Sequence, residues 1–314
     1  LAGILDYKKF WFNFNKNLEK SLKIGEIVAL NSLKLKKKKI EWYDTGNIKS
    51  LELVKKKFNK NQFNILNKNN EDIWFVNNRV IKFYKEKNLI KKKFLRSKIL
   101  YNYVPKINFY KGNIFCYNFI KGKTFSENKN IKNFKLLLDF SKSLWKKKKL
   151  NEKQKKEFHQ KCNNFYKLKT YKRINDFIKK YNIKTNKEFI NNEEVPNIFE
   201  LLKKINWKEL SNGIPVRFHG DYHFENIIFN KRRFLSIDWR QDFSGLLNYG
   251  DIYYDLAKLL HGIIVSHKIV NRDKYFYKKK SKNITISIQK TKNYKAYIIN
   301  YKKWIIQNNY DFKK

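Results

Sequence analysis

The chain has 314 residues, of which 42% are hydrophobic and 17% aromatic, so it can bury a sizeable core and differs from disordered proteins. Its formal net charge of +45 would suit a nucleic-acid ligand, but only eight of its 72 lysine and arginine residues are arginine. Arginine reads phosphates and bases best, whereas an excess of lysine with asparagine indicates codon drift in an AT-rich genome. We therefore do not expect nucleic-acid binding to be the main role.

No apolar run approaches the roughly 20 residues that cross a bilayer, which predicts no transmembrane helix. The N-terminus lacks the basic start and apolar stretch of a secretory signal. Cys116 and Cys162 lie far apart in the sequence and form no spacing typical of a metal site or a redox pair. Together these features favour a reducing, cytoplasmic location. The chain contains no methionine, so we expect the natural protein to begin upstream of Leu1.

Residues 1–55 form an N-terminal segment in which apolar side chains recur at helical spacing. From about 60 to 120 the pattern changes to short β-type runs around one lysine-rich helix at 87–101. Asn77-Asn78 between two of these runs is typical of a tight hairpin. The pattern predicts a small β-rich unit with strands at 63–66, 73–76, 80–84, 107–110 and 114–120.

Residues 121–314 are predicted to form a second, mainly helical unit. Ile131, Phe134 and Leu138 keep helical spacing, and Asp251 is a good N-cap for the helix that follows it. Further β structure is expected as a short strand near 214–218, a hairpin around 230–233 and a strand at 284–288. The two units together predict an α+β fold, with a small antiparallel β part followed by a helical part.

Three polar residues carry the strongest functional signal. Phosphoryl transfer requires a group that orients the attacking hydroxyl and oxygen ligands that hold Mg²⁺ against the phosphates. Asp221 lies at the tip of the loop that is expected to follow the strand near 214–218, and Asn226 follows five residues later. Asp238 comes after the predicted hairpin, which would return it to the same end of the unit. This combination predicts a site that handles phosphate with the help of a metal ion.

The motifs around these residues resemble those of a known family. The sequences HGDYHFEN at 219–226, SIDW at 236–239 and YGDIYYDLAK at 249–258 are similar to motifs of the aminoglycoside phosphotransferase and choline kinase superfamily. That superfamily is related in fold to the protein kinases. The resemblance covers roughly residues 60–270 and implies a bilobal protein-kinase-like fold, with ATP and Mg²⁺ bound in the cleft.

The resemblance also implies roles for individual residues. Asp221 would be the catalytic base, and Asn226 and Asp238 would be the Mg²⁺ ligands. Three further residues match positions that shape the catalytic loop and support the resemblance without carrying chemistry: His219, Gly220 and His223.

The match in the β-rich unit is less complete. Lys82 matches the strand lysine that contacts the α- and β-phosphates of ATP, and a hinge containing Phe119 and Ile120 would meet adenine through its backbone. The family pairs this lysine with an acid on the following helix, yet no aspartate or glutamate occurs between Glu86 and Glu127. Either Glu86 takes that role or Lys82 is held differently.

A fainter resemblance concerns residues 5–47, which are similar to the tail of a sugar-phosphate nucleotidyltransferase and imply fusion to such a domain upstream. We therefore expect an ATP-dependent phosphotransferase that acts on a hydroxyl of a small molecule, such as a sugar, a polyol or choline in surface-glycan or lipid metabolism. The alternatives are a catalytically degenerate nucleotide-binding module and a basic nucleic-acid-binding protein. A protein kinase is not expected, because the stretch 238–251 is too short for an activation segment.

Overall fold

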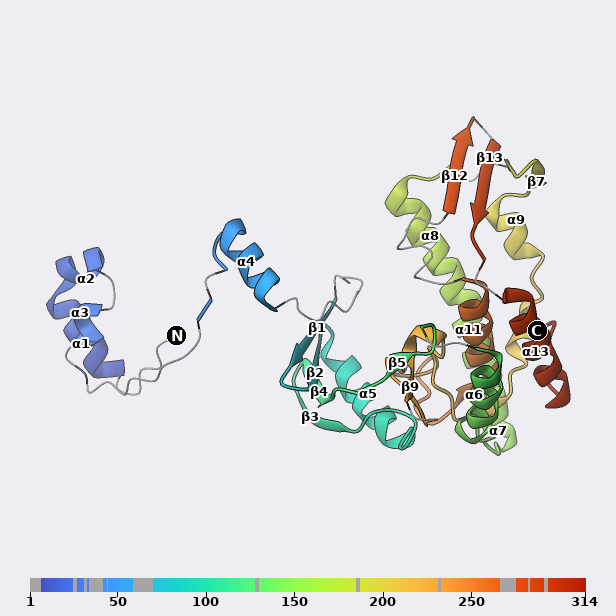
Figure 1. Cartoon of the computed structure of the whole chain (residues 1–314), viewed down its shortest axis with the longest axis horizontal. Helices are drawn as coiled ribbons and strands as arrows, with labels where there is room; N and C mark the ends of the chain where they lie inside the picture. Colours follow the sequence, from blue (N-terminus) through green and yellow to red (C-terminus); the bar gives the residue numbers. More distant parts are fainter. Residues whose placement is uncertain are drawn as a thin grey trace. The chain divides into compact units, whose positions relative to one another are not determined.

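The computed structural model describes most of the chain, which divides into two compact units, Leu1–Leu66 and Asn67–Lys314 (Figure 1). In the first unit the rings of Phe10, Trp11 and Phe14 pack against one another on a helix. The helices of this unit are α1 (Tyr7–Lys16), α2 (Leu18–Ile24), α3 (Ile27–Leu30) and α4 (Ile48–Phe58). The described residues are 7–24, 27–30, 33, 42–43, 45–58, 70–127, 130–184, 187–230, 233–265, 275–281, 283–290 and 293–314.

The second unit begins with a four-stranded antiparallel sheet in the order β1-β2-β4-β3. Asn77 and Asn78 join the first two strands with φ of 47° and 58°, the double left-handed conformation of the hairpin turn that their sequence predicts. Four of the five predicted strands are confirmed, and the one at 63–66 lies outside the described residues. The strands are β1 (Glu71–Val76), β2 (Arg79–Tyr84), β3 (Ile107–Lys111) and β4 (Ile114–Asn118).

The following helix α5 (Lys87–Ile99) packs on β2 and β3, and it carries a fully buried cation. The Arg96 guanidinium donates to the carbonyl oxygens of Phe218, Arg240 and Leu247, the last at 2.9 Å. Burial lowers the pKa of Arg96 to about 10, so it stays charged at neutral pH. One helix of the β-rich part is thereby fixed to three loop segments of the helical part.

The remainder of the second unit is mainly helical, as predicted, so the predicted α+β fold class is confirmed. Asparagine side chains start several of its helices: Asn130 accepts from Asn133 N–H, and Asn151 forms a capping box with Gln154. The helices are α6 (Ile131–Leu144), α7 (Glu152–Asn163), a π-helical turn (Asn164–Leu168), α8 (Lys169–Tyr181), α9 (Ile198–Lys203), α10 (Trp207–Ser211), α11 (Ile252–Ile264) and α13 (Tyr294–Gln307).

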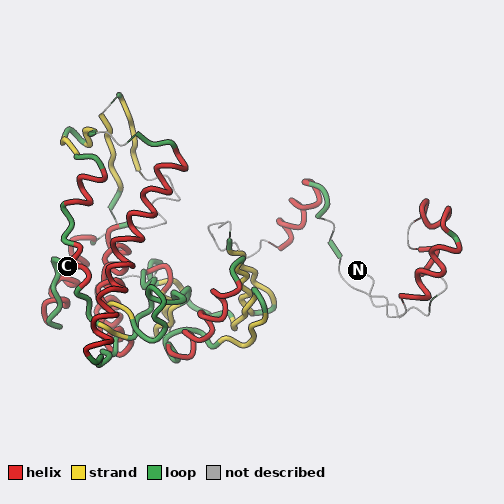
Figure 2. The backbone as a smooth tube through the Cα atoms, turned by 180° about the vertical axis from the view of Figure 1, so that it is seen from behind, coloured by secondary structure: helices red, strands yellow, loops and turns green. Residues whose placement is uncertain are grey.

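A second four-stranded sheet, in the order β12-β13-β6-β7, departs from the sequence prediction. Only its strand β13 was expected, whereas the hairpin β6-β7 was expected to be part of a helical stretch. In Figures 1 and 2 the β12-β13 hairpin lies between α8 and α9. Its strands are β6 (Glu188–Ile190), β7 (Glu193–Val195), β12 (Tyr275–Lys280) and β13 (Asn283–Ile288).

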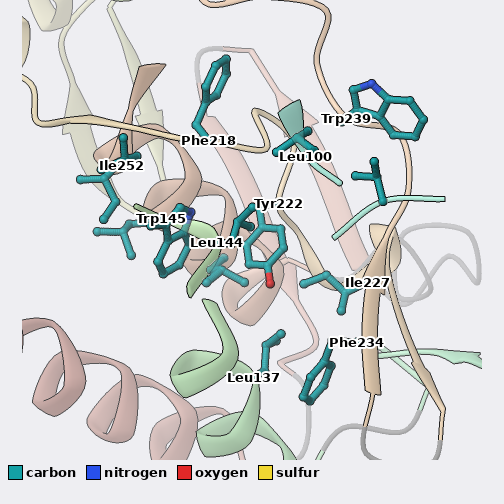
Figure 3. Close-up of a cluster of buried hydrophobic side chains, with 14 of the residues drawn as sticks. Leu100, Leu137, Leu144, Trp145, Phe218, Tyr222, Ile227, Phe234, Trp239 and Ile252 are labelled. Carbon is teal, nitrogen blue, oxygen red and sulfur yellow. The ribbon is translucent and has the colours of Figure 1, made fainter. Parts of the chain in front are cut away.

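A continuous apolar core joins the β-rich and helical parts of the second unit. Figure 3 shows members from both, including Leu100 after α5 and Tyr222 of the predicted catalytic loop. The ring of Tyr222 meets that of Trp145 edge-on at 5.6 Å, and its hydroxyl lies 2.9 Å from the Ser141 hydroxyl. Burial of this kind fixes the loop backbone next to the reactive residues. Within the described part of the chain, no helix has the length and apolar character to cross a membrane.

Replacing Arg96 by lysine should reveal how much this cation stabilises the fold. A lysine ammonium can satisfy fewer of the three carbonyl groups, and a buried carbonyl left without a donor costs about 1–3 kcal/mol. We expect Arg96→Lys to lower the free energy of unfolding in urea by about 2–4 kcal/mol. Arg79→Lys, at the exposed start of β2, is the matched control and should stay within about 0.5 kcal/mol. Equal stability of the two variants would contradict the role assigned to Arg96.

Candidate active site

The predicted catalytic loop, residues 217–226, leaves strand β8 (Pro215–Val216) and makes a turn that requires glycine. Gly220 has a φ of +89°, and a Cβ built on it would lie 2.4 Å from the Cβ of Arg240. The Arg240 N–H also donates to the His219 carbonyl at 3.0 Å. The absence of a side chain at Gly220 therefore lets the segment after Asp238 lie directly against the catalytic loop.

The structure brings Asp221, Asn226 and Asp238 together, as the sequence predicts. Asn226 closes the 3₁₀ turn Phe224–Asn226 and donates its Nδ2 to the Asp221 carbonyl at 3.0 Å and to Asp221 Oδ2 at 3.1 Å. The Asn226 carbonyl in turn accepts the N–H of Ile237, the residue before Asp238, at 2.8 Å. The hairpin of β9 (Ile227–Asn230) and β10 (Arg233–Ser236) returns the chain to this point.

Two cationic side chains surround the Asp221 carboxylate. Lys258 Nζ lies 2.8 Å from Oδ1, and His223 Nε2 lies 3.6 Å from Oδ2. Burial of Asp221 favours its neutral form, but the hydrogen bond and charge of His223 and the charge of Lys258 outweigh burial and lower its pKa. Asp221 is therefore firmly ionised, and it is suited to accept a hydrogen bond from a hydroxyl group rather than to act as a strong base.

A buried carboxylate on α11 holds the loop backbone from behind. Asp255 accepts the N–H of His219 at 2.6 Å and the N–H of Gly220 at 2.7 Å, and it also accepts the indole N–H of Trp145 at 3.0 Å. Burial raises the pKa of Asp255 to about 6, although these three donors and Arg96 oppose the shift. The carboxylate thus fixes the conformation of the residues that precede Asp221.

The two histidines of the motif bind to groups within the loop. His219 is fully buried, and burial lowers its pKa to about 3, so its neutral ring accepts the Asp221 N–H at Nδ1 over 3.2 Å. His223 lies between Asp221 and Glu225, whose Oε2 is 3.0 Å from its Nδ1. Burial opposes a charge on His223, but its hydrogen bonds to both carboxylates prevail and raise its pKa to about 9.

Lys82 is held differently from the family pattern, which settles the question left by the sequence. Its buried ammonium contacts the Asp238 carboxylate directly and lies 3.7 Å from Glu71 Oε1. Glu71 belongs to the neighbouring strand β1 and accepts the hydroxyl of Tyr84 at 2.9 Å. The acid that faces Lys82 therefore comes from the sheet rather than from the helix, and Glu86 is an exposed N-cap of α5.

The predicted hinge follows strand β4. The N–H of Phe119 donates to the Asn78 carbonyl at 2.7 Å, and its ring packs edge-on against Phe75 at 6.0 Å. That N–H is therefore committed to the protein. The contact of Phe119 and Ile120 with adenine stays a prediction.

The donor set suits Mg²⁺. Asn226 uses its Nδ2 on Asp221, which leaves its Oδ1 to accept a hard cation, and Asp238 offers a carboxylate. No group of three or more His, Cys, Asp and Glu in the described residues is placed to hold a metal ion by itself. Phosphate and water oxygens would have to complete the coordination, which is how Mg²⁺ is usually bound beside nucleotides.

Two residues of the site have no role in the sequence prediction. Glu71 precedes the strand predicted at 73–76, and only the pairing of β1 with β2 reveals that it lies near Lys82. Lys258 is the last residue of the quoted motif at 249–258, one helical turn after Asp255. Its spacing could have placed it on the face of α11 that meets the catalytic loop, because residues three apart share a face.

Residues 181–271 match the model of the phosphotransferase enzyme family, and this stretch contains the catalytic loop, Asp238 and α11. The match agrees with the resemblance of the motifs at 219–226, 236–239 and 249–258 to those of phosphotransferases. No curated protein sequence matches the chain.

Several solved structures are similar. One is APH(2'')-IIa in a ternary complex with streptomycin and ATP, at 17% identity over 67% of this chain and 74% of that chain, with a TM-score of 0.36. The Plasmodium vivax ethanolamine kinase is 19% identical over 69% and 68% of the two chains, with a TM-score of 0.36. The Cryptosporidium parvum choline kinase is 13% identical over 77% and 71%, with a TM-score of 0.35. TM-scores this low describe a loose likeness only.

The raised pKa of His223 makes the stability of the loop depend on pH. A histidine with a pKa of about 9 in the folded state and about 6.5 in the unfolded state stabilises the fold fully below pH 6.5, and this contribution is lost as the pH rises through 9. We expect the difference in unfolding free energy between the natural chain and His223→Gln to shrink by about 2–3 kcal/mol between pH 6 and 9.5. His159→Gln, at an exposed position of α7, is the matched control. A difference that stays constant or grows over this range would contradict the assignment.

Proposed function

We propose that this chain is a kinase that transfers the γ-phosphate of ATP to a hydroxyl group of a small molecule. The observation that carries the proposal is the hydrogen-bonded pair of Asp221 and Asn226, to whose backbone Ile237 binds next to Asp238, with Lys82 in contact with Asp238. The match to the phosphotransferase enzyme family over residues 181–271 supports the same reaction class. Fusion to an upstream nucleotidyltransferase is a further part of the proposal, and it rests on the resemblance of residues 5–47 alone.

In this proposal Asp221 accepts a hydrogen bond from the acceptor hydroxyl. This hydrogen bond orients the hydroxyl oxygen towards the γ-phosphorus. The oxygen–phosphorus bond forms as the bond from the γ-phosphorus to the β-bridging oxygen breaks, and ADP leaves. The hydroxyl proton passes to the Asp221 carboxylate and then to water. A weakly basic carboxylate suffices, because phosphoryl transfer depends more on position and charge than on early removal of the proton.

The other residues would position the phosphates. Bound Mg²⁺ would neutralise the β- and γ-phosphates, and Asn226 and Asp238 would be its protein ligands. Lys82, already buried and oriented by Glu71 and Asp238, would donate to the α- and β-phosphates. The contact with Glu71 answers the main argument for a degenerate module, which was the missing acid on the helix.

The first experiment is a measurement of ADP release from Mg·ATP with sugars, polyols, choline, ethanolamine and aminoglycosides as acceptors. We expect one class to stimulate ADP formation and Asp221→Asn to lower kcat by about 10²–10⁴-fold, because the hydroxyl loses its acceptor. Asp139→Asn, at an exposed position of α6, is the matched control and should leave kcat unchanged. ATP binding without any stimulated turnover would favour the degenerate module. Salt-dependent binding of DNA or RNA that persists in Asp221→Asn would favour the nucleic-acid alternative.

A second experiment tests how Lys82 is held. Glu71→Gln keeps the shape of the side chain but removes the charge 3.7 Å from the Lys82 ammonium. Lys82 would then keep its contact with Asp238 but lose the charge of Glu71, and we expect the KM for ATP to rise by about 3–10-fold with little change in kcat. Glu86→Gln is the control and should have no effect. A larger effect of Glu86→Gln than of Glu71→Gln would restore the helix residue as the partner.

A further inference from the structure

Three cationic side chains converge beside Asp221 on two aromatic rings. Lys169 Nζ lies 3.9 Å from the ring centroid of Phe165 and 5.8 Å from that of Tyr254. The Arg240 guanidinium lies 4.8 Å and 5.9 Å from the same two centroids, and Lys258 Nζ lies 5.9 Å from the centroid of Tyr254. The cations come from α8, from the segment after Asp238 and from α11, so the fold gathers them from distant parts of the sequence.

This cluster, defined as Lys169, Arg240 and Lys258, reaches the catalytic carboxylate. Lys258 Nζ is 2.8 Å from Asp221 Oδ1, and Lys169 is close enough for the charge of Asp221 to act on its pKa. Arg173 adds a fourth positive charge one turn further along α8 and also acts on Lys169. An acceptor molecule whose hydroxyl meets Asp221 would therefore lie against these cations.

The cluster has too few counter-charges of its own. Arg240 Nε is buried and, among the described residues, has no hydrogen-bond partner. Lys169 makes no ion pair in the described part of the chain, and burial followed by repulsion from Arg240, Arg173 and Lys258 lowers its pKa to about 7. Two acids whose charges interact with the cluster are already engaged, because Asp221 pairs with Lys258 and Asp242 pairs with Lys92 at 2.8 Å.

Half-buried like charges are unfavourable unless something compensates them. A bound oxyanion would do so, because guanidinium and ammonium groups bind phosphate and carboxylate oxygens through strong charge-assisted hydrogen bonds. The aromatic rings of Phe165 and Tyr254 already stabilise the cations from one side, which leaves their donors available on the other.

We propose that the acceptor is an anion, a hydroxylated small molecule whose phosphate or carboxylate group binds Lys169 and Arg240 while its hydroxyl meets Asp221. This inference rests on the proposed kinase activity and narrows its substrate class. It excludes choline, ethanolamine and aminoglycosides, since a cation would meet like charges at this position. The reaction that supplies the substrate must therefore be one that leaves an acidic group on a polyol or sugar.

The test compares neutral acceptors with their acidic derivatives. The pairs are glycerol with glycerol 3-phosphate, ribitol with ribitol 5-phosphate and glucose with glucuronate, together with choline and ethanolamine. We expect the anionic member of at least one pair to have a kcat/KM about 100-fold above that of its neutral partner. Lys169→Gln should raise the KM for that anion by about 10-fold or more and leave the KM for ATP unchanged. Lys172→Gln, an exposed lysine on the same helix, is the matched control and should change neither.

Three outcomes would overturn the inference. A neutral or cationic acceptor could give the highest kcat/KM, Lys169→Gln could act on the KM for ATP instead, or it could act no more strongly than Lys172→Gln. If no acceptor is turned over, the anion site is tested by a calorimetric titration. Glycerol 3-phosphate is titrated into the chain in the presence of a non-hydrolysable ATP analogue and Mg²⁺. Binding that Lys169→Gln weakens supports the anion site, and no binding or equal binding opposes it. Failure of the ATP analogue itself to bind would count against the proposed kinase activity, and the titration without it would still report on the cluster.

Discussion

The buried Arg96 guanidinium is the interaction on which the geometry of the site depends. It donates hydrogen bonds to the carbonyl oxygens of Phe218, Arg240 and Leu247. Arg96 lies on α5, which packs on the sheet that contains Lys82. The catalytic loop, the segment after Asp238 and the β-rich part are thereby fixed to one planar group with donors in a rigid arrangement. The contact of Lys82 with Asp238 across the two parts follows from this attachment.

Other contacts of the site act on its backbone. Asp255 accepts two consecutive N–H groups of the catalytic loop, and Lys93 donates to the carbonyl of Trp239, next to Asp238. These hydrogen bonds fix the backbone next to Asp221 and Asp238 without involving the carboxylates of these two residues. The low pKa of Asp221 and the high pKa of His223 are consequences of the same close packing of charges.

The sequence predicts the residues that lie close together along the chain and misses those that meet through tertiary pairing. Asp221 and Asn226 are five residues apart in one turn, whereas Glu71 reaches Lys82 only through the register of two strands. The missed hairpin β6-β7 has strands of three residues, too short to show alternation, although its Asn191-Asn192 turn repeats the signal recognised at Asn77-Asn78. Convergence of Lys169, Arg240 and Lys258 likewise requires three elements to pack, which no local pattern encodes.

The turns in which asparagine has a positive φ also limit which residues can replace it as the composition of this chain changes. Among the described residues, eight of the eleven non-glycine positions with positive φ are asparagine, in a sequence with only ten glycines. Asparagine tolerates this conformation and has less backbone freedom to lose on folding than glycine. A turn built from asparagine therefore loses less conformational entropy on folding than the same turn built from glycine. A lysine at any of them would lie in a region that costs most residues about 1–2 kcal/mol. Positions with a positive φ therefore disfavour lysine, even in a chain this rich in it.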